Sequence, residues 1–171
     1  MVIVRPCQEQ DLALLRAHIP TPGQPDRHAT RFERQQSGHS TFLIAWMDDL
    51  PVGAGEIFWR GCSAPEINQH YPDCPELNGL DVWPPELRSQ GIGTTIITAA
   101  EDITRHRGHH RIGLGVEDGN SRAAALYLRL GYQETGRNYL DRYTYIDADG
   151  TRHDIADPAR FLVKNLDRTT S

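Results

Sequence analysis

The sequence predicts a mixed α/β fold in which helices flank one central sheet. Segments with strand-like and helix-like periodicity alternate along the whole chain. The length of 171 residues suits one domain that buries a core of its own. Hydrophobic residues make up 38% of the chain and charged residues 24%, which is an ordinary balance for a globular protein. We therefore expect a single domain that spans residues 1–171.

Strands are expected where apolar residues alternate or form short runs between turn formers. In chain order they cover residues 2–6, 40–47, 52–60, 76–82, 111–116 and 159–166. The turn "DDLP" joins the second and third strands in an antiparallel hairpin. The sequence around "DADG" predicts another hairpin over residues 143–155, near the C-terminus.

Helices are expected where apolar residues recur every three or four positions, and one short, mostly polar segment is also expected to be helical. In chain order they cover residues 8–18, 27–38, 91–107 and 120–131. Asn120 is suited to cap the start of the last helix, and Gly131 to end it in a left-handed conformation. Residues 61–75 are rich in turn formers and predict a long loop, of a length that is often functional.

Composition and charge exclude several classes of function. The formal net charge is −5 and no basic tract is interleaved with aromatics, so nucleic-acid binding is not expected. No apolar run approaches the length of a membrane span, and the first residues lack a signal-peptide pattern. We therefore expect a cytoplasmic protein with no membrane partner. The cysteines, Cys7, Cys62 and Cys74, are expected to be reduced, although a Cys62–Cys74 bridge stays open in principle.

The segment "RHRGHHR" resembles a metal-binding cluster because it contains His106, His109 and His110. These histidines have no cysteine or carboxylate companion at zinc-site spacing. Cations near a helix C-terminus are favourable without any metal. No metal is expected.

The segment "RSQGIG" places Gly91 and Gly93 between an expected strand and an expected helix. A helix N-terminus presents unpaired N–H groups, and glycine lets a phosphate approach the backbone closely. Arg88 would add a bidentate cation. The alternative is a tight turn with close packing. Without GK[ST], and without a third glycine in the GxGxxG frame, neither a Walker loop nor a Rossmann fingerprint is present.

Together with "GNSRAAALYLRLGY", which begins 26 residues after Gly93, this segment resembles the GNAT superfamily of acetyl-CoA-dependent N-acetyltransferases. Arg88, Gly91 and Gly93 match its first motif. Its second motif is matched by Asn120, Ala123, Leu126, Tyr127, Gly131 and Tyr132. The resemblance covers about residues 76–136. It implies a central, mostly antiparallel sheet flanked by helices, with the C-terminal hairpin as an extension.

The resemblance also implies a cofactor site. The backbone of Val82 and Trp83 would pair with the pantetheine arm of acetyl-CoA, and Asn120 would touch that arm. Backbone N–H groups from Arg88, Ser89, Gln90, Gly91, Ile92, Gly93 and Thr94 would hold the pyrophosphate. One departure is "WPPEL" after Val82, where the family more often has four residues, so the loop before the glycines is expected to differ.

The chemistry implied by the resemblance is direct attack of a free amine on the acetyl thioester, which needs a base and benefits from an acid. Tyr127 would protonate the departing thiolate; the alternative for this residue is core packing. Glu76 is the candidate base, although its spacing is off by about one residue. The alternatives are that Glu76 is a solvated strand-end carboxylate, or that the base is Glu56, Asp81 or a water.

The acceptor is expected to be the primary amine of a small molecule. Acidic residues on the candidate acceptor side would suit a cation, and aromatic residues would wall the site. These residues are Glu56, Glu66, Asp73, Glu76 and Asp81, with Trp59, Tyr71 and Trp83. A protein N-terminus or lysine, another acyl-CoA, a hydroxyl acceptor, and a non-catalytic CoA-binding or regulatory domain remain alternatives. The edge strands and the C-terminal hairpin would support a homodimer.

Overall fold

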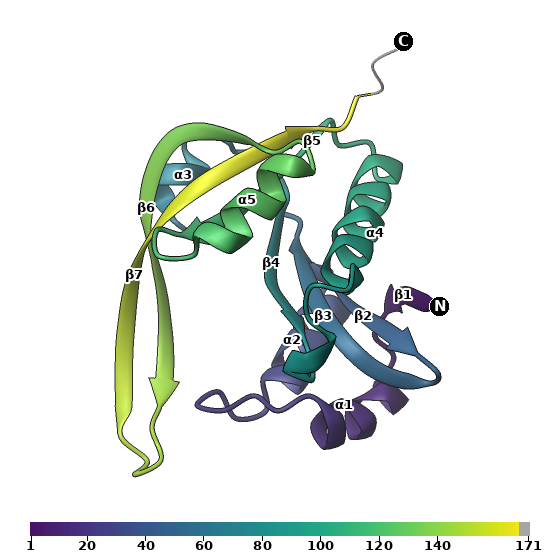
Figure 1. The fold of residues 1–171 in the computed structure, drawn as a ribbon. Helices are drawn as coiled ribbons and strands as arrows, with labels where there is room; N and C mark the ends of the chain where they lie inside the picture. Colours follow the sequence, from purple (N-terminus) through teal and green to yellow (C-terminus); the bar gives the residue numbers. More distant parts are fainter. Residues whose placement is uncertain (168–171) are drawn as a thin grey trace. The chain divides into compact units, whose positions relative to one another are not determined.

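The computed structural model describes residues 1–167, and the chain forms two compact units (Figure 1). Unit 1 consists of Met1–Trp59 and Leu77–Ile103, and unit 2 begins with Arg60–Glu76 and continues from Thr104. Both units combine strands with helices, which confirms the mixed α/β class that the sequence predicts.

Unit 1 is a sheet with helices formed by the segments between its strands. Its strands are hydrogen-bonded in the order β1-β2-β3-β4, and the first two pairs are antiparallel. The strands are β1 (Val2–Pro6), β2 (Ser40–Met47), β3 (Leu50–Phe58) and β4 (Glu76–Val82), of which Glu76 belongs to unit 2. The helices are η1 (Glu9–Asp11), α1 (Leu12–His18), α2 (Arg27–Gln36), η2 (Pro85–Leu87) and α4 (Ile92–His106), whose last turn belongs to unit 2.

The core of unit 1 forms because β2 is a continuous apolar run that is buried along nearly its whole length. Phe42 and Ile44 pack with Leu15 of α1 in one cluster. Ile92 and Ile96, one turn apart on α4, belong to a second cluster. The helix that follows the glycine motif is thus fixed by its own apolar face.

Unit 2 contains a three-stranded antiparallel sheet in the order β5-β7-β6. Its elements are α3 (Pro65–Asn68), β5 (Arg111–Glu117), α5 (Ser121–Arg129), β6 (Gln133–Ile146) and β7 (Arg152–Asn165). Glu76, the first residue of β4, pairs in parallel with Gly113 of β5. In Figure 1, β6 and β7 form a long two-stranded ribbon.

One face of β5 carries no side chain at two successive inward positions, Gly113 and Gly115. The ring of Phe161 from β7 occupies the space of a Cβ at Gly113, and the hydroxyl of Tyr139 from β6 occupies that space at Gly115. The two rings meet edge to face with centroids 6.5 Å apart. Aromatic side chains therefore lie directly on the β5 backbone.

The structure extends two of the expected elements. The expected 143–155 hairpin and the separate strand 159–166 are parts of one pair of 14-residue strands, joined around Asp147. Most residues of β6 are exposed, so its first half lacks the apolar alternation that marks a strand. The expected loop 61–75 also contains α3, whose first residue is Pro65.

Candidate active site

The glycine segment of unit 1 follows β4 through Trp83 and η2. The Trp83 N–H donates to the carbonyl of Val52 in β3 at 2.9 Å, so pairing with β3 continues past the end of β4. Arg88 Nε donates to the Val82 carbonyl at 3.1 Å, and its guanidinium lies 3.5 Å from Asp81. A pantetheine arm that pairs with the Val82 carbonyl would therefore share this oxygen with Arg88, since a carbonyl can accept two hydrogen bonds.

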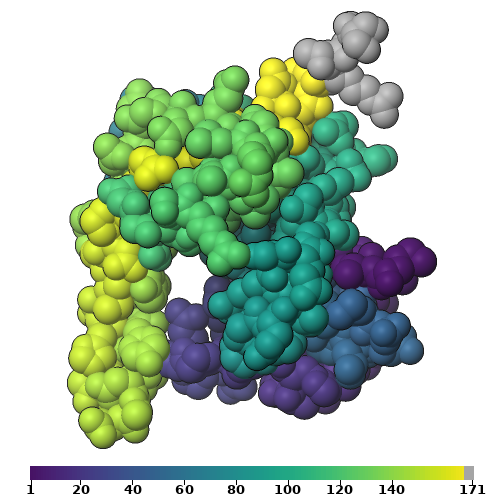
Figure 2. Space-filling view, in the orientation of Figure 1, coloured from purple at the N-terminus to yellow at the C-terminus, as the bar shows by residue number. Residues whose placement is uncertain are grey.

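The backbone from Ser89 to Gly93 is shaped by two left-handed residues and bordered by open space. Ser89 has φ 65° and Gly91 has φ 86°, which is a conformation that favours glycine. A Cβ built on Gly91 would meet nothing within 4 Å, and one built on Gly93 would meet only Leu80 Cδ2, at 3.9 Å. Close packing within the protein therefore does not explain Gly93. The teal segment that contains this loop is uncovered in the space-filling view (Figure 2).

The start of α4 leaves backbone N–H groups without an acceptor inside the helix. The Thr95 N–H donates to the Gly91 carbonyl at 3.0 Å, as the first α-helical hydrogen bond of the helix. The N–H groups of Ile92, Gly93 and Thr94 precede that bond, in the positions where a helix has no internal acceptor. With the partial positive charge of a helix N-terminus, these groups are suited to bind a phosphate.

The start of α5, in unit 2, is capped as the sequence predicts. Asn120 Oδ1 accepts a hydrogen bond from the Ala123 N–H at 3.1 Å. Gly131 follows the helix with φ 96°. The carbonyl oxygen of the Asn120 amide is thus engaged in the cap, and the side-chain NH₂ is the group that Asn120 would offer to a ligand.

Tyr127 is half-buried on α5. Its ring packs edge to face against Tyr132, with centroids 6.2 Å apart. Burial raises the pKa of the Tyr127 hydroxyl above its ordinary value. Within residues 1–167 this hydroxyl makes no hydrogen bond. The ring serves packing, and the hydroxyl is available to another molecule.

Glu76 is buried, with 3% of its surface exposed, so it is not a solvated strand-end carboxylate. The thiol of Cys62 donates a hydrogen bond to it. Burial and then the negative charge of Glu76 raise the pKa values of Cys62 and Tyr139. The Glu76 carboxylate therefore lies beside a thiol and a phenol that both stay protonated at neutral pH.

The two rival carboxylates of unit 1 are ion-paired. Glu56 is buried between Arg31, at 3.3 Å, and Arg34, at 2.7 Å. Burial tends to raise the pKa of Glu56, but the Arg34 hydrogen bond and the two guanidinium charges outweigh burial and hold that pKa below its ordinary value. Glu56 is therefore a poor base. Asp81 is partly exposed and faces Arg88.

Sequence reasoning missed the arginines that surround Glu56. Arg27, Arg31 and Arg34 lie on α2, and their spacing of four and three residues places them on one face of a helix. That spacing is readable in "RHATRFER", but an arginine-rich face is usually solvated, and no sequence pattern tells that this one is turned toward the sheet.

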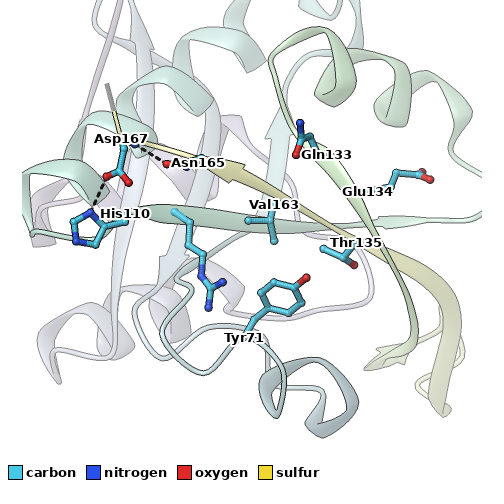
Figure 3. A pocket seen from close by; sticks show the side chains of 9 residues that line it. Tyr71, His110, Gln133, Glu134, Thr135, Val163, Asn165 and Asp167 are labelled. Carbon is cyan, nitrogen blue, oxygen red and sulfur yellow. Dashed lines mark hydrogen bonds and ion pairs between the residues drawn. The ribbon is translucent and has the colours of Figure 1, made fainter. Parts of the chain in front are cut away.

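A hollow of about 310 Å³ in unit 2 contains none of the expected cofactor or catalytic residues (Figure 3). Several of its polar groups bind each other. His110 Nδ1 lies 2.7 Å from Asp167, whose N–H donates to Asn165 Oδ1 at 2.8 Å. The Arg111 guanidinium lies 4.9 Å from the ring centre of Tyr71. We assign this hollow no part in the reaction.

Other features concern metals, thiols and membranes. No group of three or more His, Cys, Asp or Glu residues within positions 1–167 is placed to hold a metal ion. Cys7, Cys62 and Cys74 are all buried free thiols, so no Cys62–Cys74 bridge is present. In the same part of the chain, no helix combines the length and apolar character that crossing a membrane requires.

Residues 11–132 match the family model described as "Acetyltransferase (GNAT) family". The match covers most of the chain, so the protein belongs to this family and is an acyltransferase, as the two motifs indicate. Among curated protein sequences, none matches the chain.

Solved structures with the same fold include three acetyltransferases. The spermidine/spermine N-acetyltransferase SpeG from Vibrio cholerae has a TM-score of 0.67 and 14% identity over 96% of this chain and 92% of that one. The ribosomal-protein-S18-alanine N-acetyltransferase from Escherichia coli has a TM-score of 0.66 and 18% identity over 100% and 97%. The putative acetyltransferase yncA from Salmonella typhimurium, solved with acetyl-CoA, has a TM-score of 0.65 and 18% identity over 100% and 97%.

Proposed function

We propose that this protein transfers the acetyl group of acetyl-CoA to the primary amine of a small molecule by direct attack. The observation that carries the proposal is the open backbone at Gly93, at the start of the 15-residue helix α4. A glycine that no protein atom requires, at an anion-binding helix terminus, is explained by a phosphate that comes close to the chain. Membership of an acetyltransferase family supports CoA as the molecule that carries it.

In this proposal the backbone holds the donor. The N–H groups of Ile92, Gly93 and Thr94 bind the pyrophosphate, with those of residues 88–91 completing the cradle. Arg88, whose Nε is bonded to the Val82 carbonyl, supplies the other N–H groups of its guanidinium. The Val82 and Trp83 backbone and the Asn120 side chain bind the pantetheine arm.

The reaction requires one group that accepts a proton and one group that donates a proton. Glu76 accepts a proton from the substrate ammonium, because only the neutral amine is a nucleophile. The amine nitrogen then bonds to the acetyl carbon, and the carbon–sulfur bond breaks. Tyr127 gives its proton to the departing thiolate, the new amide nitrogen loses its second proton to solvent, and Tyr127 regains one proton from solvent. The net proton released is the one that Glu76 accepted from the ammonium. In water the transfer from Tyr127 is uphill, from a phenol with a pKa near 10 to a thiolate near 8.5, and burial raises the pKa of Tyr127 further. The transfer therefore requires the site to raise the pKa of the departing thiol by more.

Glu76 is preferred as the base because Glu56 is committed to two arginines and Asp81 faces a third. The buried Glu76 carboxylate would receive the proton through a water. The hydrogen bond from Cys62 would hold the carboxylate in one orientation.

The test is a screen of primary amines with acetyl-CoA that follows release of the CoA thiol and detects the acetylated amine by mass spectrometry. The proposal expects thiol release that depends on the amine and equals the acetylated product. Release without an acceptor would indicate a hydrolase. Binding of acetyl-CoA with no release for any amine would indicate a non-catalytic CoA-binding domain, and transfer confined to peptides would indicate a protein acetyltransferase.

A further inference from the structure

Three arginines of α2 in unit 1 are turned toward β3 and β4. Arg31 is buried, with 3% of its side chain exposed, and Arg34 is 37% exposed. Both donate hydrogen bonds to the buried carboxylate of Glu56. Arg31 also donates to the carbonyl of Gly79 in β4 at 3.0 Å. One carboxylate therefore already serves two guanidinium groups.

The third arginine, Arg27, has no such partner. It is half-buried, and within residues 1–167 its side chain makes no hydrogen bond or ion pair. A Cβ built on Gly79 would lie 2.7 Å from Arg27 Nη2 and 2.5 Å from Arg31 Nη2. Two guanidinium groups thus converge on one bare backbone position, where φ is 63° inside a strand.

This arrangement is electrostatically unfavourable as it stands. Burial lowers the pKa of Arg27, and burial together with the charge of Arg27 lowers the pKa of Arg31 to about 10. The carboxylates near Arg27 are Asp81 and Glu56, and these already face other arginines. Partly buried cations are normally paired. An anion at Gly79 would supply the missing partner.

The position on β4 indicates which ligand brings that anion. The pyrophosphate is expected at residues 88–94, beyond the end of β4, and the pantetheine arm at Val82 and Trp83. Gly79 precedes Val82 by three strand residues, or roughly 10 Å, in the opposite direction from the pyrophosphate. The arginine pair therefore lies toward the reacting end of the donor, where the acceptor must be.

We infer that Arg27, with the positive charge of Arg31 beside it, binds a carboxylate of the acceptor, so the acceptor carries both an amine and a carboxylate. This inference rests on the proposed acetyl transfer and changes the acceptor expected from the sequence. Glu56 was expected to attract a cation, but the structure gives it two arginine partners instead. Planar guanidinium groups bind carboxylates through two parallel hydrogen bonds, which orients the acceptor as well as holding it.

The test uses matched acceptors, each set consisting of an L-amino acid, its amide and the corresponding decarboxylated amine. The acids are expected to have the highest kcat/KM in their sets. In Arg27→Gln, KM for the acid should rise by roughly 10- to 100-fold, the size of one lost charged hydrogen bond. KM for acetyl-CoA should stay unchanged. Arg16→Gln removes the same charge from an exposed position in unit 1 and should leave all three acceptors unaffected.

The melting temperature of Arg27 variants distinguishes a role in acceptor binding from a structural role. Removal of an unpaired, partly buried cation should leave the melting temperature of Arg27→Gln unchanged or raised, whereas loss of a structural contact would lower it. Arg27→Lys, which keeps the charge but not the planar fork, should recover only part of the affinity.

Binding can be measured without turnover, by calorimetry with an N-acetyl-L-amino acid and its amide. The inference is supported if the wild type binds the acid more tightly than the amide and Arg27→Gln does not. This result would support the carboxylate site even if no amine were acetylated and the proposed reaction failed. Equal binding of acid and amide, or a preference that survives in Arg27→Gln, overturns it. Acetylation of polyamines alone, such as spermidine, would overturn the carboxylate site and leave acetyl transfer intact. Tighter binding of an aminophosphonate would overturn the choice of carboxylate.

Discussion

At Tyr127 the ring and the hydroxyl have separate surroundings. The ring packs against Tyr132, while the hydroxyl makes no hydrogen bond within residues 1–167. Burial raises the pKa of this phenol, so it stays protonated across the physiological range, as a weaker acid than a phenol in water. Tyr127→Phe can therefore remove the hydroxyl while it keeps the packing of the ring.

Tyr127→Phe should lower kcat by about 10²-fold or more, the range for a lost general acid, with little change in melting temperature or acetyl-CoA affinity. The loss should shrink with an acyl donor whose leaving thiol is more acidic, because that thiolate needs less protonation. Tyr145→Phe makes the same change at an exposed site and is the control. Near-normal turnover in Tyr127→Phe would assign the residue to packing alone.

Glu76 and Glu56 are both buried glutamates, but their neighbours differ. Glu56 lies between two guanidinium groups, whereas Glu76 lies beside a thiol and a phenol. A carboxylate held by two guanidinium groups contributes to stability and is a poor proton acceptor. The two residues should therefore respond differently to the same substitution.

Glu76→Gln should lower kcat and replace the acidic limb that belongs to Glu76 with one set by the pKa of the acceptor amine, because the rate then follows the concentration of free amine. Glu56→Gln should mainly lower the melting temperature, because it leaves Arg31 and Arg34 without their shared anion. Kinetic pH profiles and thermal unfolding of both variants make the comparison. An unaltered acidic limb in Glu76→Gln would transfer the base role to Asp81 or water.

At the scale of elements, the junction between β4 and α4 was readable from the sequence because its signal is local. A glycine pair before a helix is visible in six residues, and the structure adds that Gly93 has open space beside it. The burial of Glu76 was not readable, since Cys62 and Tyr139 come from segments 14 and 63 residues away in the sequence. The start of β6 was missed because its side chains are mostly polar and exposed.

Gly93→Val should abolish the rise in melting temperature that acetyl-CoA causes in the wild type. Its side chain would fill the space that the phosphate needs, while the free protein should stay folded because no protein atom is close. Gly93→Ala should reduce this rise less than Gly93→Val does, because the alanine side chain is smaller. Gly91→Val should also lose binding, but its φ of 86° adds backbone strain, which makes Gly93 the more informative site. An unchanged ligand shift in Gly93→Val would exclude the cradle.

At the scale of the whole molecule, the family and its α/β fold were predictable because two motifs at fixed separation specify them. The prediction of one domain over residues 1–171 stays a prediction, as do the homodimer and the cytoplasmic location. The chemical class of the acceptor was not predictable, because it depends on which charged side chains become buried and paired when the chain folds. Glu56 looked like a free acidic group in the sequence, and only the fold brings α2 against it.

The three buried cysteines make thiol reactivity a measure of whether the protein is folded. Burial raises the pKa values of Cys7 and Cys74 to about 12 and raises that of Cys62 as well, so the folded protein holds almost no thiolate at pH 8. An aromatic disulfide reagent should therefore register the released CoA thiol with little background from the enzyme.

The cysteines are also divided between the two units. Cys7 lies in unit 1, whereas Cys62 and Cys74 lie in unit 2. Alkylation at increasing urea, read by peptide mass spectrometry, should then report the opening of each unit separately. Equal labelling of all three thiols in native buffer would contradict their burial.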